Sequence, residues 1–344
     1  MKNTLHNFRQ GLIALVWFGV CLAVAAADES APPNLRLKSG PALIFSALAT
    51  PIIFKGDATT AYRDPAVIYS DGVFHLYFTL AKIEPDGKPY LYTAWSRSTN
   101  LAQWTKPRIF TPRDLSLNFS SPGNVIRFRN EWVLCHQTYP RPNGQKHGSS
   151  DARVWTRRSR DLENWSEPEL FRVKGPDVPQ EKMGRMIDPF LLEDKDDPGK
   201  WWCFFKQNGA SMSWSRDLTN WTYSGRLEAG ENVCVLVVAG EYVMFHSPGN
   251  GIGMKRSPDL KTWRDDGLIT LGQKEWPWAK GRLTAGFVLD LKSDPLIGKY
   301  LMFFHGSGPE DERTMFDSFA SIGIAWSDDL KGWSWPGKTN ASAR

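Results

Sequence analysis

Three carboxylates stand where three short apolar runs of this sequence begin. Asp64 and Asp188 each precede a proline, and Glu231 precedes an asparagine. Carboxylates that share one site repel one another, and this repulsion raises the pKa of at least one of them. A carboxyl with a raised pKa can donate a proton near neutral pH while an ionised partner accepts one. Taken singly, each residue only starts a strand or faces solvent, whereas the three together predict general acid–base catalysis.

A seven-residue motif recurs five times and indicates which elements must position these carboxylates. The motif is Ser-x-(Asp/Asn)-Leu-x-x-Trp. Its copies are Ser98–Trp104, Ser159–Trp165, Ser215–Trp221, Ser257–Trp263 and Ser327–Trp333. A repeat of this kind is typical of stacked copies of one supersecondary unit. We expect the Asp or Asn of each copy to cap a turn and the Trp to pack between neighbouring units.

Short runs rich in β-branched and aromatic residues surround each copy of the motif. Gly, Asn, Asp and Pro separate these runs, which is typical of antiparallel hairpins. Four antiparallel strands repeated five times predict an all-β fold, a five-bladed β-propeller of four-stranded antiparallel blades. Residues 42–54 lie outside the five units, and we expect them to close the ring beside the last blade. Residues 28–344 then form a single propeller domain.

The first 27 residues predict a secretory signal peptide. Lys2 and Arg9 precede an apolar run of 15 residues, Gly11–Ala25, and small residues at 25–27 provide a cleavage site. The run is short for a membrane-spanning helix, so an uncleaved anchor is the alternative rather than the main expectation. Cys21 raises the question of lipidation, but the residues before it match a lipidation sequence poorly. We therefore expect a secreted or periplasmic protein without a membrane partner after cleavage.

Charge and cysteine content exclude several classes of function. Without Lys2 and Arg9, 40 basic side chains face 37 acidic ones, and a net charge of +3 gives no electrostatic basis for binding nucleic acid. Cys135, Cys203 and Cys234 remain, and an odd number of cysteines does not make a disulfide framework. We expect buried thiols, with one Cys203–Cys234 bridge as the alternative. The sequence indicates no oligomeric state.

The innermost strands of a propeller begin at its axis, so their first residues converge on one funnel. The expected catalytic residues are Asp64, Asp188 and Glu231. The expected sugar-binding residues are Arg63, Lys206, His246, Trp278 and Arg282. The second strands also end at the funnel, near Thr79, His136, Lys206, His246 and His305. Arg185 and Trp276 lie in loops before blades, where we expect them to shape the subsite.

The sequence resembles glycoside hydrolase family 43 and the related five-bladed furanosidase propellers. The likeness rests on RDPAVIYSDGVFHLYFT at 63–79, IDPFLLED at 187–194, ENVCVLVVAGEYVMFHS at 231–247 and the five turn motifs. The resemblance implies that Asp64 is the general base, that Asp188 holds the acid and tunes its pKa, and that Glu231 is the general acid. It also implies inversion at the anomeric carbon, which requires the base and acid carboxyls to stand about 6.5–9.5 Å apart.

The resemblance extends to a candidate metal site and leaves the identity of the acid open. His305 is similar to a last-blade histidine that in relatives sits over a central calcium or water, so a structural Ca²⁺ at the axis is the candidate, although the chemistry requires no cofactor. Relatives have Gly-Pro after the acid, whereas Asn232 and Val233 stand here. Glu228 and His246 are therefore rival acids.

The function expected from these residues is that of an exported, inverting exo-glycosidase. Its substrate would be a terminal α-L-arabinofuranose or β-D-xylose of a plant or algal oligosaccharide or polysaccharide. Two alternatives stay open at this point. One is a carbohydrate-binding propeller without catalysis. The other is a related hydrolase or phosphorylase of the same fold, and a phosphorylase would need a basic phosphate pocket, for which Arg63, Lys206 and Arg282 are available.

Overall fold

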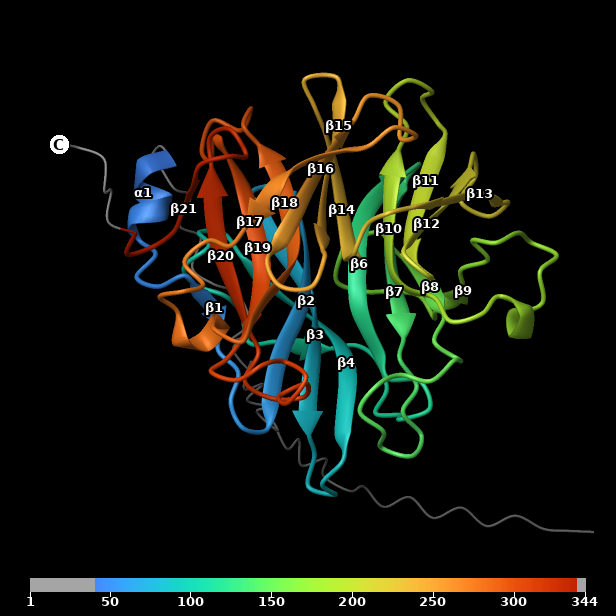
Figure 1. Ribbon diagram of the computed structural model, residues 1–344, viewed down its shortest axis with the longest axis horizontal. Helices are drawn as coiled ribbons and strands as arrows, with labels where there is room; N and C mark the ends of the chain where they lie inside the picture. The colour runs from blue at the N-terminus through green and yellow to red at the C-terminus, as the bar shows by residue number, and fades with distance from the viewer. Residues whose placement is uncertain (1–40, 339–344) are drawn as a thin grey trace, which may run out of the picture. The chain divides into compact units, whose positions relative to one another are not determined.

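Five antiparallel sheets make up the computed structural model, which describes residues 41–338 (Figure 1). The expected five-bladed propeller is confirmed, since each of the five sheets forms one blade. The innermost strands of the five blades gather in the middle of the view, and each contacts the innermost strands of its neighbours. The expected signal peptide lies outside the described residues.

The first three blades each contain four strands in chain order. Blade 1 consists of β2 (Thr60–Ser70), β3 (Val73–Ile83), β4 (Pro89–Ser98) and β5 (Arg108–Ile109). Blade 2 consists of β6 (Phe119–Phe128), β7 (Glu131–Thr138), β8 (Val154–Ser159) and β9 (Glu169–Leu170). Blade 3 consists of β10 (Ile187–Glu193), β11 (Trp201–Lys206), β12 (Ala210–Ser215) and β13 (Thr222–Leu227).

The last two blades show how the ring closes. Blade 4 consists of β14 (Glu231–Val238), β15 (Glu241–Ser247), β16 (Ile252–Ser257) and β17 (Arg264–Ile269). Blade 5 consists of β18 (Arg282–Leu291), β19 (Lys299–Ser307) and β20 (Ser321–Ser327), with β1 (Ile52–Phe54) and β21 (Trp333–Ser334) both paired to β20. The expected closure by residues 42–54 is therefore confirmed for β1, which joins the start of the fold to its last blade.

Helical structure is sparse in the described part of the chain. It consists of α1 (Pro41–Ser46), η1 (Gln180–Lys182) and η2 (Pro277–Ala279). Phe45 of α1 stacks on Trp326 of β20, with ring centroids 4.6 Å apart, so this helix packs beside the closing blade. Over residues 41–338, none of these helices has the length and apolar character that crossing a membrane would require.

The repeated motif forms the same capped turn in every blade. In blade 3, Asp217 Oδ1 accepts hydrogen bonds from the backbone N–H groups of Thr219 (2.8 Å) and Asn220 (2.7 Å). The leucine of each copy has a left-handed backbone, with φ between 61° and 66°. Because the cap satisfies two N–H groups at a strained backbone position, the Asp or Asn has a structural role. The expectation of a capped turn is confirmed.

The tryptophans of the motif contact neighbouring blades. The ring of Trp165 in blade 2 lies edge-on to Tyr77 in blade 1, with centroids 5.7 Å apart. Tyr77 also donates its hydroxyl to the backbone oxygen of Leu162 in the same turn, at 2.6 Å. Trp104 in blade 1 contacts Phe303 in blade 5 in the same way, at 6.4 Å. These contacts confirm the expected packing between blades.

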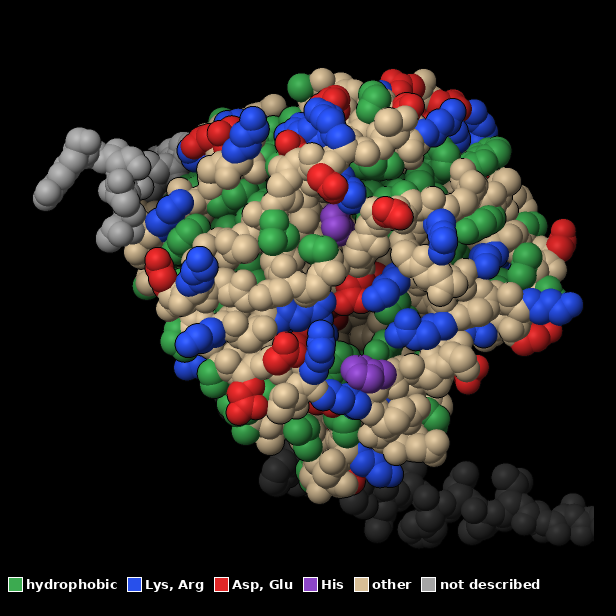
Figure 2. Space-filling view, viewed as in Figure 1, with side chains coloured by type: hydrophobic (Ala, Val, Ile, Leu, Met, Phe, Trp, Pro, Cys, Tyr) green, Lys and Arg blue, Asp and Glu red, His purple; other side chains and the backbone are tan. Residues whose placement is uncertain are grey.

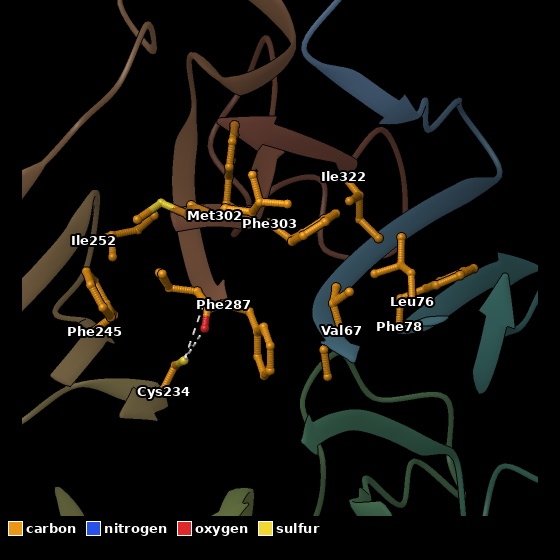
Figure 3. Packing of buried hydrophobic residues seen from close by; sticks show 14 of the residues in the cluster. Val67, Leu76, Phe78, Cys234, Phe245, Ile252, Phe287, Met302, Phe303 and Ile322 are labelled. Carbon is orange, nitrogen blue, oxygen red and sulfur yellow. Dashed lines mark hydrogen bonds between the residues drawn. The ribbon is translucent and has the colours of Figure 1, made fainter. Parts of the chain in front are cut away.

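Buried hydrophobic side chains fill the space between blades (Figure 3). Phe245, Ile252, Phe287 and Met302 come from blades 4 and 5 and pack into one cluster. The three cysteines of the described residues are buried and free, so the alternative of a Cys203–Cys234 bridge is wrong. The Cys234 thiol instead contacts the Val288 backbone oxygen, at 3.7 Å, across the boundary between blades 4 and 5.

Candidate active site

Each innermost strand carries a bulge that places one residue with a left-handed backbone next to the axis. These residues are Asp64 (φ 48°), Ser121 (φ 42°), Asp188 (φ 52°), Asn232 (φ 52°) and Ala285 (φ 52°). The pairing with the second strand shifts at each of these points. Left-handed conformations of residues other than glycine cost on the order of 1 kcal/mol each and cluster at functional sites. The five bulges line one small cavity at the axis.

The bulges show that the three carboxylates do not occupy equivalent positions in their blades, contrary to what the sequence had led us to expect. Asp64 and Asp188 occupy the bulge itself, and the residue at that position in blade 4 is Asn232. Glu231 stands one residue earlier, at the position that Arg63 takes in blade 1. The three carboxylates nevertheless line one pocket, so the expectation that the fold brings them together holds.

A second set of residues binds four of the five bulges to the blade before them. The side chains that accept the N–H of the next bulge are Thr79 for Ser121 (2.7 Å), Gln137 for Asp188 (2.7 Å), Ser247 for Ala285 (2.9 Å) and His305 for Asp64 (3.1 Å). Blade 3 is the exception, because it has Lys206 at this position and an ammonium group cannot accept a hydrogen bond. Lys206 forms an ion pair with Glu231 instead.

This ring of contacts shows that sequence reasoning misplaced two histidines by one residue. Gln137 and Ser247 occupy the second-strand positions for which His136 and His246 were expected. A shift of one residue in a strand moves a side chain to the opposite face of the sheet. His136 therefore stacks on Phe119, at 4.8 Å, and is buried.

The pocket beside this ring has a volume of about 510 Å³ when its open mouth is included. The residues lining it include Arg63, Asp64, Thr79, Ser121, Gln137, Tyr139, Asp188, Glu231, Arg282 and Phe316. Figure 2 shows acidic and basic side chains gathered around a hollow near the middle of the face in view. The concave shape and the convergent polar groups are those of a small-molecule site.

Asp64 is held from two sides. Thr79 donates its hydroxyl to Asp64 Oδ2, at 2.9 Å, and accepts the backbone N–H of Ser121. His305 Nδ1 accepts the backbone N–H of Asp64. The carboxyl of Asp64 is 14% exposed and faces the pocket, so a water molecule or substrate can reach it.

Asp188 is the carboxyl of this site that is poised to carry a proton. Burial and the charges of Glu231 and Asp64 together raise the pKa of Asp188 to about 7, against the lowering effect of the hydrogen bond from Ser121. That hydrogen bond runs from Ser121 Oγ to Asp188 Oδ1, at 2.7 Å. A carboxyl that titrates near pH 7 is suited to proton transfer at physiological pH.

Glu231 has the opposite ionisation. Burial favours its neutral form, but the ammonium of Lys206 and the guanidinium of Arg282 outweigh burial, so the pKa of Glu231 is lowered. Arg282 Nη2 lies 2.8 Å from Glu231 Oε1, and Lys206 contacts the other oxygen. In the unliganded pocket the proton of the Asp188–Glu231 pair therefore resides on Asp188. This placement differs from the expectation that Glu231 carries it.

Glu312 is a buried carboxylate that sequence reasoning missed. It is 1% exposed and forms ion pairs with Arg63 and with Arg282, whose Nη1 lies 2.6 Å from Glu312 Oε2. Glu312 lies in the loop between β19 and β20, which has no strand periodicity to mark a position as buried. Both arginines that were expected to bind sugar are thus bound by a carboxylate of the chain itself.

Two loops from different blades meet beside the pocket. Arg141, in the loop after β7, makes a two-fold hydrogen bond to Asp317, at 2.7 and 2.8 Å, although Arg141 is itself only 1% exposed. Tyr139 and Phe316 stack at 6.2 Å on the same two loops and line the pocket. The two loops therefore form one wall of the pocket.

The remaining sequence candidates lie away from the lining of the pocket. His246 is buried, and its Nδ1 accepts the backbone N–H of Gly230, at 3.0 Å, so it holds the residue that precedes Glu231. Burial lowers the pKa of His246 to about 4, which removes it as an acid near neutral pH. Trp278 stacks on Trp276, at 5.2 Å, in a packed aromatic cluster. Glu228, the other rival acid, is exposed.

The residues around His305 do not fit a calcium site. His305 Nδ1 accepts the N–H of Asp64, and Nε2 lies 3.3 Å from Glu312 Oε1, so both ring nitrogens already have protein partners. Calcium takes six to eight oxygen ligands. Within residues 41–338, His, Cys, Asp and Glu side chains form no group of three that could hold a metal ion.

Known proteins match the chain in structure and not in sequence. No family model and no curated protein matches it. An exo-1,5-α-L-arabinanase from a bovine ruminal metagenomic library matches with a TM-score of 0.54 and 13% identity, over 78% of this chain and 94% of its own. Zg3597, a family 117 glycoside hydrolase of the marine bacterium Zobellia galactanivorans, matches with a TM-score of 0.58 and 13% identity, over 78% and 84%. A thermostable family-43 glycoside hydrolase matches with a TM-score of 0.56 and 14% identity, over 86% of this chain and 98% of its own.

At these identities the likeness establishes the fold alone. The chain has the five-bladed β-propeller fold that solved glycoside hydrolases of families 43 and 117 adopt. The resemblance found in the sequence is confirmed at that level.

Proposed function

We propose that this protein is a secreted, inverting exo-glycoside hydrolase that releases terminal sugars such as α-L-arabinofuranose or β-D-xylose. One observation carries the proposal. Asp64, Asp188 and Glu231 line one pocket, and their surroundings give Asp188 a raised pKa and Glu231 a lowered one. A pair of carboxyls whose environments separate their pKa values can divide the roles of acid and base between them.

The proposed reaction is a single displacement at the anomeric carbon. Asp64 accepts a proton from a water molecule, and the water oxygen forms a bond to that carbon. The bond from the carbon to the leaving oxygen breaks, and the leaving oxygen receives a proton from the Asp188–Glu231 pair. Glu231 delivers this proton because it is partly exposed, whereas the buried Asp188 stores it before substrate binds.

Lys206 controls the transfer in this scheme. While its ammonium contacts Glu231, that carboxylate stays ionised. A sugar hydroxyl that takes the place of the ammonium removes one of the two positive charges beside Glu231, and the pKa of Glu231 then rises toward that of Asp188. The proton can pass to Glu231 only when the pocket is occupied, which couples protonation of the acid to binding.

The wall formed by the two loops supports release of terminal sugars. The ion pair of Arg141 with Asp317 and the stacked rings of Tyr139 and Phe316 join loops from blades 2 and 5. A wall at one side of the pocket would hinder passage of a continuous polysaccharide chain, whereas an end of the chain could still enter. This arrangement supports the proposal of exo-action.

The charges of the pocket favour a neutral sugar over phosphate. Arg63 and Arg282 both contact Glu312, and Arg282 and Lys206 both contact Glu231. Each of these cations therefore has a carboxylate partner that an incoming phosphate would have to displace. Arg63, Lys206 and Arg282 therefore do not form the unpaired basic pocket that a phosphorolytic reaction would need.

Proton NMR of the products tests the proposal in one experiment. The protein is incubated with arabino- and xylo-oligosaccharides, with and without phosphate, and the first anomer formed is recorded. We expect one terminal sugar per event, in the inverted configuration and without a phosphate ester. A retained anomer would contradict the roles of the carboxylates, and internal cleavage would contradict the role of the wall.

A second candidate is a carbohydrate-binding propeller that does not hydrolyse its ligand. The observation in its favour is that Lys206 and Arg282 keep Glu231 ionised, which removes the proton from the expected acid. Its signature is binding of an oligosaccharide, measured by calorimetry, without release of any sugar from the same ligand.

A further inference from the structure

Glu312 is a buried carboxylate that the proposed reaction does not use. Three side chains from the core of the propeller surround it. These are Arg63 of β2, Arg282 of β18 and His305 of β19. A carboxylate with 1% exposure would be strongly destabilising without such partners. The charges of Arg63 and Arg282 and the hydrogen bond from His305 outweigh burial and keep the pKa of Glu312 well below its usual value, so it is ionised.

Two of the partners of Glu312 also contact a carboxylate residue that lines the pocket. Arg282 reaches Glu231 through Nη2, at 2.8 Å, while its Nη1 contacts Glu312 at 2.6 Å. His305 accepts the backbone N–H of Asp64 through Nδ1 and contacts Glu312 through Nε2, at 3.3 Å. Glu312 is therefore one side chain away from both Glu231 and Asp64.

The contacts also define the tautomer of His305. Its Nδ1 accepts a hydrogen bond, so in the neutral ring the proton must lie on Nε2. That Nε2–H then donates to Glu312. The carboxylate fixes which nitrogen carries the proton, and with it the orientation of the ring beneath the Asp64 backbone.

We propose that Glu312 is a positioning residue that holds Arg282 against Glu231 and fixes His305 beneath Asp64, so that the loop between β19 and β20 sets the charge balance of the pocket. The inference rests on the proposed function in one respect, which is that the charge balance governs hydrolysis. The geometry itself does not depend on the reaction.

Removal of the charge on Glu312 has a defined consequence for Asp188. The titratable groups that face Glu312 are Arg63, Arg282 and His305, and beyond them lie Asp64, Glu231, Asp188, Lys206 and Asp317. Without Glu312, the two arginines have one carboxylate fewer to neutralise them. The pocket becomes more positive, the ionised form of Asp188 is favoured, and its pKa falls.

Glu312→Gln in the full-length protein tests this inference, with Glu310→Gln as the matched control because Glu310 is exposed on the same loop. The measurement is the titration of the Asp188 carboxyl by ¹³C NMR, which begins from a wild-type pKa of about 7. We expect the midpoint to fall by about half a pH unit or more in Glu312→Gln and to stay unchanged in Glu310→Gln. Glu312→Asp, which keeps the charge, should stay near the wild type. An unchanged midpoint in Glu312→Gln overturns the proposal.

Two further readouts keep the test decisive. If Glu312→Gln does not fold, the proposal is tested by ¹⁵N NMR of the His305 ring in the wild type. The proposal requires the Nε2–H tautomer of this ring. An Nδ1–H tautomer overturns it. If hydrolysis is found, the alkaline limb of the rate profile should move to lower pH in Glu312→Gln, whereas a merely structural role would lower the rate equally at all pH values. The NMR titrations need no turnover, so they stand or fall separately from the proposed function.

Discussion

At the scale of single residues, the pocket divides its charges unevenly. Asp188 is buried and has a raised pKa, while Glu231 lies beside two cations and has a lowered one. Asp64 is hydrogen bonded by Thr79 and stays accessible from the pocket. Residues 64, 188 and 231 could be singled out from the sequence because each stands at or near the start of an expected innermost strand. Glu312 could not, because a carboxylate in a loop gives no periodic signal of burial.

The raised pKa of Asp188 makes a prediction about stability. Its pKa is 3.8 in the reference state and about 7 in the fold, so folding disfavours its ionised form. The stabilisation associated with the neutral carboxyl is complete below the reference pKa and is lost as pH rises through 7. Asp188→Asn has no charge to bury and should gain on the order of a few kcal/mol relative to the wild type between pH 4 and pH 8. Thermal unfolding of both proteins across this range measures the difference, and a constant difference would contradict the buried charge.

Lys206 makes a second prediction at this scale. In Lys206→Met the pKa of Glu231 should rise, because the first cation that opposes its burial is gone. Titration of the Glu231 carboxyl by ¹³C NMR measures the change. Lys200→Met is the control, since Lys200 precedes the same strand at its other end and pairs with Asp194. An equal Glu231 pKa in wild type and Lys206→Met would refute the role given to Lys206.

At the scale of elements, the repeated turns and the bulges have different origins. The turn motif was readable in the sequence because each copy repeats the same Asp or Asn cap and the same leucine with positive φ. The bulges were not readable, because Asp64, Ser121 and Ala285 share a backbone conformation and not a residue type. The strand register around His136 and His246 was off by one residue for the same reason, since a bulge shifts the pairing without any sequence signal.

The cap of the third turn can be tested by a pair of variants. Asp217→Ala removes the acceptor of two backbone N–H groups and should cost about 1 kcal/mol in the free energy of unfolding. Asp217→Asn keeps an oxygen in the same place and should cost less, as the natural Asn100 at the equivalent position makes the same two bonds at 3.1 and 2.9 Å. Chemical denaturation compares them, and equal losses in the two variants would show that the cap is not the stabilising feature.

At the scale of the whole molecule, the propeller depends on close packing between blades. The number of blades and the closing strand could both be predicted, because hydrophobic runs and turn motifs mark the blades and residues 42–54 were left without a partner. How closely neighbouring blades approach could not be predicted. Gly123 in blade 2 lies so near blade 3 that an added Cβ would stand 1.4 Å from the backbone oxygen of Pro189.

This close approach predicts a strong effect of a single methyl group. Gly123→Ala must push the backbones of blades 2 and 3 apart. It should lower the free energy of unfolding by about 1–3 kcal/mol, the usual range for overpacking. Gly249→Ala is the control, since its Cβ meets no atom within 4 Å. Thermal unfolding separates the two, and equal midpoints would show that the blades are not in contact at Gly123.

The central claim is that the pocket hydrolyses glycosides through its three carboxylates, and Asp64 tests it most directly. The measurement is the release of sugar from a panel of aryl glycosides and natural oligosaccharides by the wild type and by Asp64→Asn, with folding of both checked by circular dichroism. We predict that the wild type releases one terminal sugar and that Asp64→Asn, equally folded, releases essentially none. Release at the wild-type rate by Asp64→Asn would contradict the account.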